Sequence, residues 1–243
     1  MIPLIFAAAV ATAAPAQAQR PLIAGTATRS GCPELVTPDA LVCRALEAEK
    51  SGNNVSAAQA FEEAAKAAGD KDPKTARMYA AAGNLWIAAD QPAKAVADLD
   101  KALTLNGLEG KQRGQALLDR ARAAEEQGDL ATARARLNEA KVTISDDPFY
   151  WYFSAALAIR ERDGATAQTA IAQALTLAPT DPAVLFEAGH VADFNGDDDR
   201  ARSYWMRAAG SDPNGPVGKA AAKAVEMLGV TPVVKTDPAP AKN

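Results

Sequence analysis

The sequence contains few aromatic residues and no surplus of positive charge. Aromatics make up 5% of the 243 residues, whereas apolar residues as a class reach 48%, with alanine by far the commonest. A sheet protein would need more β-branched and aromatic residues, while alanine has the highest helix propensity and lets helices approach closely. The net charge of −4 gives no indication of nucleic-acid binding. The composition therefore favours an all-helical protein without a nucleic-acid partner.

Residues suited to catalysis are equally scarce. The chain has a single histidine, His190, and it has neither a glycine-rich phosphate loop nor a paired-cysteine metal site. Enzymes bring several titratable groups or metal ligands together in one place. The sequence therefore predicts no catalytic set, no cofactor and no metal, and an enzyme is a distant alternative.

The acidic stretch at residues 193–199, DFNGDDD, is the place where a metal has to be weighed. Its oxygen-bearing side chains alternate as in a calcium loop. However, the glycine stands in the fourth place rather than the sixth, and Tyr204 stands where a bidentate glutamate would close the site. We expect an acidic turn whose carboxylates are favoured near the next helix N-terminus, and a calcium-responsive module is the distant alternative.

The N-terminus has the pattern of an export signal. An apolar run at residues 2–14 is followed by Ala16-Gln17-Ala18, the small-x-small form that a signal peptidase accepts. The run is shorter than the roughly 20 apolar residues of a membrane span. We predict a signal peptide at 1–18 that is cleaved after Ala18, and a periplasmic or otherwise exported protein. A membrane-tethered form is the alternative; no later segment could span a bilayer.

Two cysteines, Cys32 and Cys43, follow the predicted cleavage site. In an oxidising compartment, an even pair so close in sequence predicts one disulfide. Closing such a short loop would stabilise the fold by about 2–3 kcal/mol. Two buried thiols are the alternative.

One spacing of small and large apolar residues recurs five times. The copies are residues 52–64, 90–102, 128–140, 162–174 and 196–208. The sixth and thirteenth residues of every copy are alanine, and the tenth is large and apolar: Phe61, Leu99, Leu137, Ile171 and Trp205. A small residue stands seven positions before every copy: Ala45, Gly83, Ala121, Ala155 and Gly189. Such a period is typical of a stacked array.

The spacing has a simple structural interpretation. Offsets of four and three residues place the three apolar side chains on one stripe of a helix. The segment before each copy carries its own stripe, so each repeat is expected to be an antiparallel helix pair with a short turn. Stacking five pairs buries apolar faces that one pair would leave exposed. Four helix starts are predicted where a capping residue precedes proline, at Thr37-Pro38, Asp72-Pro73, Asp147-Pro148 and Asp181-Pro182.

The pattern resembles the tetratricopeptide repeat (TPR) family over residues 38–214. The resemblance is carried by Gly83, Trp86, Ala95, Leu99 and Ala102 in repeat two, Ala167, Ile171, Ala174 and Pro179 in repeat four, and Gly189, Ala201, Trp205, Ala208 and Pro213 in repeat five. It implies an all-α, right-handed α-solenoid of about five helix-turn-helix repeats, here of an exported bacterial envelope type. Repeats one and three depart from the pattern, because Arg44 and Arg120 fall on the stripe that should pack.

The chain is accordingly divided into four parts. After the signal peptide we expect an irregular lead-in at 19–36, and then the array at 37–229, which ends in a C-terminal capping helix. The proline-rich segment 230–243 is predicted to be a disordered tail.

The resemblance places the first helix of each pair on the inner face of the curve. The face opposite the packing stripe gives a predicted partner-binding groove formed by Arg77, Asn84, Leu118, Arg122, Tyr152, Phe186 and His190. Phe149 lies on the same face, although Phe149 and Tyr152 could instead pack between neighbouring repeats. Cytosolic relatives hold a chaperone's terminal carboxylates with a basic clamp. Asn84 matches one element of that clamp, but its lysine partners are missing, so that activity is not carried over.

The predicted function is a non-catalytic scaffold or adaptor in the cell envelope. Apolar and aromatic anchors with a few polar groups suit a peptide or a partner helix. The alternative is an assembly helper or a regulator of an envelope enzyme that uses the same groove.

Overall fold

The computed structural model of the chain describes residues 31–228, which form eleven helices and contain no strand. All of these helices belong to the compact unit that begins at Cys32. They are α1 (Pro38–Lys50), α2 (Asn54–Ala68), α3 (Thr75–Ala88), α4 (Pro92–Thr104), α5 (Gly110–Glu126), α6 (Leu130–Ile144), α7 (Pro148–Arg160), α8 (Gly164–Leu177), α9 (Pro182–Phe194), α10 (Asp198–Ser211) and α11 (Pro216–Leu228). The predicted signal peptide, residues 19–30 of the lead-in and the predicted tail lie outside the described residues.

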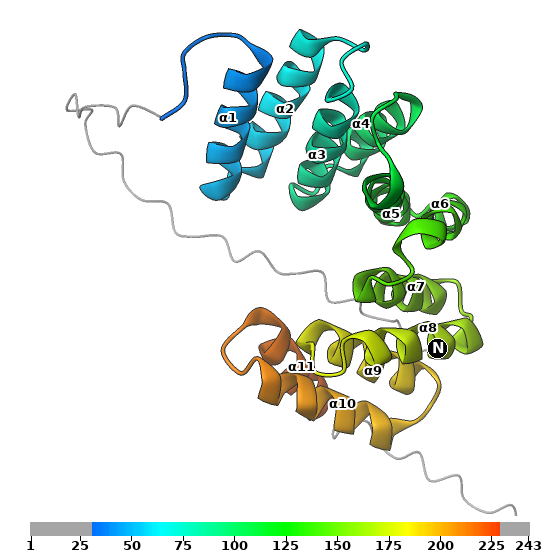
Figure 1. Ribbon diagram of the computed structural model, residues 1–243. Coiled ribbons are helices and arrows are strands. Elements are labelled where there is room, and N and C mark those ends of the chain that lie inside the picture. Colours follow the sequence, from blue (N-terminus) through cyan, green and yellow to red (C-terminus); the bar gives the residue numbers. More distant parts are fainter. Residues whose placement is uncertain (1–30, 229–243) are drawn as a thin grey trace, which may run out of the picture. The chain divides into compact units, whose positions relative to one another are not determined.

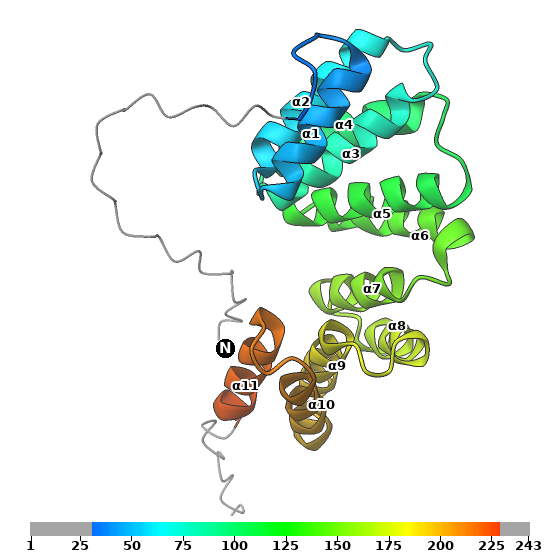
Figure 2. The ribbon, with the colours of Figure 1, turned by 60° about the vertical axis from the view of Figure 1, so that its left-hand side comes forward.

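The first ten helices form five antiparallel pairs, and each pair packs against the next (Figure 1). The first helices lie on the inner side of the array and the second helices on its outer side (Figures 1 and 2). Helix α11 packs against α10 and α9 and closes the C-terminal end. The all-α solenoid of five repeats with a capping helix, as predicted from the sequence, is confirmed.

The repeated alanines form the centre of every pair. All ten have 0% exposure: Ala57, Ala64, Ala95, Ala102, Ala133, Ala140, Ala167, Ala174, Ala201 and Ala208. The large residue between them is buried as well, and it meets the small residue of the facing helix. In the second pair, for example, a Cβ added to Gly83 would come 2.5 Å from Cγ of Leu99. The small and large residues recur because they bring the two helices of a pair into contact.

The turn inside each pair needs a left-handed backbone at its second residue, two positions after the first helix ends. Glycine fills that place in three pairs, with φ of +77° at Gly52, +79° at Gly128 and +78° at Gly196. Asp90 and Arg162 adopt the same conformation with φ of 57° and 63°, although side chains disfavour it.

Three of the four predicted helix starts are correct, and one is misplaced by two residues. The side chains of Thr37, Asp147 and Asp181 cap helices that begin at the following proline. In contrast, Asp72 accepts a hydrogen bond from the backbone N–H of Lys74 at 2.8 Å, and that turn delays the start of α3 to Thr75. The caps otherwise act as the sequence indicates.

The two arginines that depart from the repeat pattern have specific partners. Arg120 forms a two-pronged ion pair with Asp100 of α4, with Nε–Oδ1 at 2.7 Å and Nη2–Oδ2 at 3.3 Å. Arg44 holds the same place in the first pair. Its guanidinium donates instead to the backbone oxygens of Pro33 and Leu35, at 2.9 and 3.1 Å.

A disulfide joins Cys32 to Cys43 of α1, with the two Cα atoms 5.7 Å apart. The predicted pairing is therefore present, and it fixes the end of the lead-in on the first helix. The disulfide and the hydrogen bonds of Arg44 hold residues 32–36 against α1. There they cover the side of the first pair that corresponds to the contact of Arg120 with the preceding pair.

Candidate interaction surface

The helices α3, α5, α7 and α9 lie on the inner side of the array (Figures 1 and 2). Several of their polar and aromatic side chains contact one another. Their contacts run along α5, α7 and α9, and they also join α3 to α5 and α5 to α7. We call this set the inner row; it consists of Asn84, Asp119, Arg122, Phe149, Tyr152, Phe186, Glu187 and His190. Five of these residues belong to the groove predicted from the sequence.

Asp119 of α5 connects the second pair to the third. Its carboxylate accepts a hydrogen bond from Nδ2 of Asn84 at 3.0 Å, and it forms an ion pair with Nη1 of Arg122 at 2.9 Å. Burial raises the pKa of Asp119, whereas the charge of Arg122 and the hydrogen bond from Asn84 act to lower it. Two donors thus compensate a carboxylate whose side chain is only 15% exposed.

Arg122 continues the inner row into the fourth pair. Its guanidinium carbon lies 5.5 Å from the ring centroid of Phe149, within the range of a cation–π interaction. Phe149 stacks on Tyr152 with centroids 5.4 Å apart and planes inclined by 20°. The two rings thus pack on each other within α7, while Phe149 remains 40% exposed.

Tyr152 is more enclosed than Phe149. Burial, followed by the negative charge of Glu187 on the next pair, raises the pKa of Tyr152 to about 12. The hydroxyl therefore stays protonated at neutral pH and can donate a hydrogen bond to a ligand. Helices α7 and α9 pack against each other, so the charge of Glu187 acts on Tyr152 from the neighbouring pair.

Helix α9 supplies the last three members of the inner row. The rings of Phe186 and His190 lie 4.4 Å apart at 61°, and His190 also contacts the indole of Trp205 at 5.5 Å. Oε2 of Glu187 lies 3.4 Å from Nδ1 of His190. Nε1 of Trp205 donates to the backbone oxygen of Phe186 at 3.0 Å, so the core of the fifth pair supports these side chains directly.

The two other residues of the predicted groove have different surroundings. Arg77 is exposed, and its Nε donates to the backbone oxygen of Gly107 at 3.3 Å, beside the loop that enters the third pair. Leu118 is only 1% exposed and belongs to the core beneath the inner row. It supports the surface and has no area to offer to a partner.

Two acidic residues of the inner row are absent from the groove predicted from the sequence. Asp119 and Glu187 each directly follow a residue of the predicted groove, Leu118 or Phe186. A carboxylate one residue beyond the exposed stripe, at the edge that faces the preceding pair, is the signal that could have found them.

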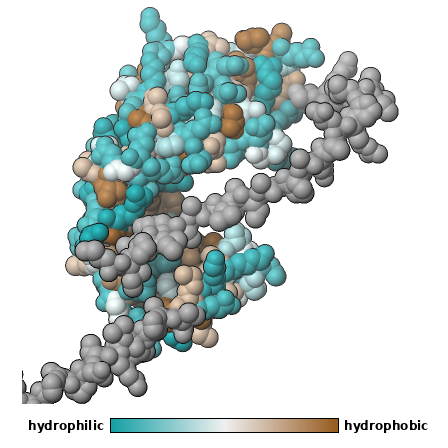
Figure 3. Space-filling view, turned by 180° about the vertical axis from the view of Figure 1, so that it is seen from behind, coloured by the Kyte–Doolittle hydropathy of each residue, from teal (hydrophilic) through white to brown (hydrophobic). Residues whose placement is uncertain are grey.

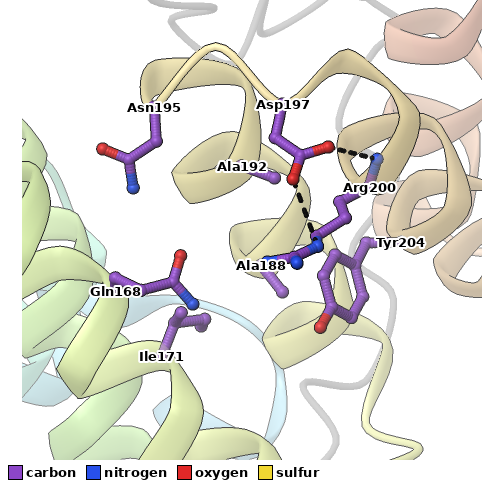
Figure 4. A pocket seen from close by; sticks show the side chains of 8 residues that line it. All are labelled: Gln168, Ile171, Ala188, Ala192, Asn195, Asp197, Arg200 and Tyr204. Carbon is purple, nitrogen blue, oxygen red and sulfur yellow. Dashed lines mark hydrogen bonds and ion pairs between the residues drawn. The ribbon is translucent and has the colours of Figure 1, made fainter.

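The acidic turn between α9 and α10 lies beside a cavity of about 150 Å³ (Figure 4). The carboxylate of Asp197 accepts from the backbone N–H of Arg200 and pairs with its Nε, both at 3.1 Å. This turn therefore caps α10, as expected for a carboxylate near a helix N-terminus. Residues 31–228 contain no group of three or more His, Cys, Asp or Glu residues placed to hold a metal ion.

Hydrophobic residues are neither gathered on the face shown in Figure 3 nor collected in a long apolar helix of the described residues. The face shown in Figure 3 is mostly hydrophilic, and its hydrophobic residues lie in separate patches. Within the described part of the chain, no helix combines the length and the apolar character needed to cross a membrane.

No protein-family model matches the sequence, and a search of curated proteins finds no match. Solved structures do match. PilW, a type IV pilus biogenesis factor, is 18% identical over 75% of this chain and 81% of its own, with a TM-score of 0.63. A tetratricopeptide repeat protein from Parabacteroides merdae is 16% identical over 79% of this chain and 73% of its own (TM-score 0.61). YrrB, a TPR protein with an unusual peptide-binding site, is 17% identical over 76% of this chain and 91% of its own (TM-score 0.54). The chain therefore has the fold of the tetratricopeptide repeat proteins.

Proposed function

We propose that the chain is a non-catalytic scaffold that binds a segment of a protein partner, either a peptide or a helix, along the inner row. The TPR fold supports a role in protein–protein interaction, since YrrB, which shares it, has a peptide-binding site. The single observation that carries the proposal is the continuity of the inner row. Its contacts join the successive first helices α3, α5 and α7 and leave an aromatic edge, that of Phe149, open to solvent.

The chemistry of the inner row fits a peptide better than a flat protein surface. Aromatic rings provide large contact areas at little conformational cost, and they are enriched at the centres of interfaces. The rings of Phe149, Tyr152 and Phe186 are held by their neighbours. A partner would therefore meet an ordered surface and would lose less entropy on binding.

The proposed location is the cell envelope, after export. The Cys32–Cys43 disulfide supports this location, because such bonds persist in oxidising compartments. An assembly helper remains the second candidate, and the observation that favours it is the likeness to PilW, a pilus biogenesis factor.

The test replaces ring residues of the inner row and compares them with an exposed residue elsewhere. Tyr152→Ala and Phe186→Ala remove the rings, while Met206→Ala changes an apolar residue on α10 that is 60% exposed. The three variants and the unaltered protein are immobilised, and the envelope proteins they retain are quantified by mass spectrometry. We expect a common set of partners to be lost from both ring variants and kept by Met206→Ala. Unchanged retention by both ring variants, with folding verified by circular dichroism, would contradict the proposal.

A further inference from the structure

The third and the fifth pairs each place a carboxylate at the same position of the first helix. Asp119 precedes the second-helix copy of its repeat by nine residues, and Glu187 does the same in repeat five. Both side chains are largely enclosed, with 15% of Asp119 and 9% of Glu187 exposed. Equivalent positions in a repeat array have equivalent surroundings, so the two carboxylates can be compared directly.

The comparison shows that Glu187 lacks the donors that Asp119 has. Asp119 receives one hydrogen bond from Asn84 on the preceding pair and an ion pair from Arg122 on its own helix. For Glu187, the residue in the place of Asn84 is Ala156, whose side chain has no donor. In the place of Arg122 stands His190, and its contact of 3.4 Å is the one polar side-chain contact of Glu187 within residues 31–228.

A buried carboxylate with so little compensation is unfavourable. A buried charge that has lost its solvent and lacks a full set of partners destabilises the folded state. The small side chain of Ala156 is half-buried, in a place where the third pair receives an amide. The Glu187 carboxylate of the fifth pair thus has one polar side-chain contact, where Asp119 of the third pair has two.

Aromatic rings lie near Glu187 on α9 and on the neighbouring helix α7. Phe186 and His190 lie against each other on α9, and Tyr152 lies one turn before Ala156 on α7. Rings of this kind attract a cation through their electron-rich faces, and they accept the methylene groups of a long basic side chain. The array already contains an internal version of such a contact. Arg122 pairs with Asp119 while its guanidinium lies over the ring of Phe149.

We propose that Glu187 is the anionic end of a subsite for a lysine or arginine side chain of the bound partner. The basic side chain enters over Ala156, passes between the rings of Tyr152 and Phe186, and pairs with the Glu187 carboxylate. This subsite rests on the proposed function, because it assumes a partner segment along the inner row. The proposed partner segment therefore contains a basic residue whose apolar neighbours contact Phe149. The opposite charges and the aromatic flanks together favour such a residue over an acidic one.

The experiment measures charge preference with synthetic peptides. Three fluorescein-labelled hexapeptide pools carry a central lysine, norleucine or glutamate between random apolar and aromatic residues. Binding to the full chain is followed by fluorescence anisotropy at low salt. We expect the lysine pool to bind about tenfold more tightly than the norleucine pool, as is reasonable for a desolvated charge-assisted contact. The glutamate pool should bind most weakly, and added salt should weaken only the lysine pool.

Three variants assign this preference to Glu187. Glu187→Gln removes the charge at almost constant shape and should bring the lysine and norleucine pools to within about twofold of each other. Ala156→Asn keeps the charge but supplies the amide that Asn84 gives to Asp119, and it should reduce the preference as well. Because it adds a donor to the buried group, it keeps the proposal testable if Glu187→Gln folds poorly. Glu139→Gln on α6 is the matched control. Glu139 forms an ion pair with Arg136 and its side chain is 47% exposed, so this variant should behave like the unaltered protein.

The outcomes separate the subsite from the proposed function. A lysine preference that persists in both Glu187→Gln and Ala156→Asn overturns the subsite, as does equal binding of the lysine and glutamate pools. If Tyr152→Ala then still abolishes binding of all pools, the inner row remains the binding surface. If no pool binds, or if Tyr152→Ala and Phe186→Ala change nothing, the subsite and the proposed function both fail.

Discussion

Gly189 of α9 lies directly against the indole of Trp205 on α10. A Cβ built on Gly189 would overlap Nε1 and Cδ1 of that ring and come within 2.7 Å of its Cε2. The indole has no room to move away, because its Nε1 donates a hydrogen bond to the backbone oxygen of Phe186 and Trp205 is buried. Trp205 therefore has two roles: it packs against Gly189 in the core of the fifth pair, and it holds the backbone of Phe186 in the inner row.

We predict that Gly189→Ala destabilises the protein by about 1–3 kcal/mol, because the new methyl group forces the two helices of the pair apart. Chemical denaturation with tryptophan fluorescence as the signal measures the effect. Gly210→Ala on α10 is the control, since a Cβ there meets nothing within 4 Å and alanine is the better helix former. That control should be neutral or stabilising. A Gly189→Ala variant as stable as the unaltered protein would show that the fifth pair is not closely packed.

The turn residues permit a prediction of opposite sign. Arg162 holds φ at 63° in the turn between α7 and α8, and Gly196 holds φ at +78° in the turn between α9 and α10. Arg162→Gly should therefore stabilise the protein by about 0.5–1 kcal/mol, and Gly196→Ala should destabilise it by a similar amount. The midpoints of urea denaturation report both changes. If both substitutions shift the midpoint in the same direction, strain at this turn position is not the cause.

Much of the fold could be predicted because the repeat is local. The apolar stripe of each helix and the glycine or polar residue at each turn lie within one stretch of sequence, and one rule applied five times gives five pairs. The start of α3 could not be predicted in this way. Asp72 has a choice between capping a helix and closing a turn, and the close approach of Gly107 to the backbone of Pro73 depends on a segment more than thirty residues away.

The inner row was predictable only in part, for a related reason. Helical periodicity identifies the exposed stripe of a single helix, and so it found Arg122, Tyr152 and Phe186. Stacking then brings Asn84 to Asp119 across 35 residues of sequence, and it encloses Leu118 beneath them. Such contacts depend on the angle between pairs, which the spacing of small and large residues does not determine.

A buried carboxyl group gives a prediction about pH. Oδ2 of Asp98 on α4 is buried without a hydrogen-bond partner in the described part of the chain. Burial, and then the negative charge of the neighbouring Glu62, raise the pKa of Asp98 from 3.8 to about 7. Between these values the folded protein keeps a proton that the unfolded chain releases. The free energy of unfolding should therefore fall as the pH rises through this range and then level off.

Asp98→Asn should remove this pH dependence and raise stability above pH 7, because a neutral amide replaces a charge that is poorly solvated. Thermal melts between pH 4 and 8 provide the measurement. Glu63→Gln neutralises an exposed carboxylate on the helix that carries Glu62, and it should leave the pH profile almost unchanged. A profile for Asp98→Asn that parallels the unaltered protein would mean that Asp98 is not the group responsible.

The N-terminal end of the array permits a prediction about where stability is lost. Residues 32–36 are held on α1 by the Cys32–Cys43 disulfide and by the hydrogen bonds of Arg44 to Pro33 and Leu35. Reducing the disulfide should cost about 2–3 kcal/mol. In a repeat array, each pair depends mainly on its neighbours, so the loss should remain local. We expect amide hydrogen exchange to accelerate in α1 and α2 after reduction and to change little in α9 and α10.

Arg44→Ala should produce the same pattern to a smaller extent, because it removes two hydrogen bonds and leaves the covalent link in place. Faster exchange along the entire array would instead show that the five pairs unfold as one cooperative unit, and that the disulfide stabilises all of them equally.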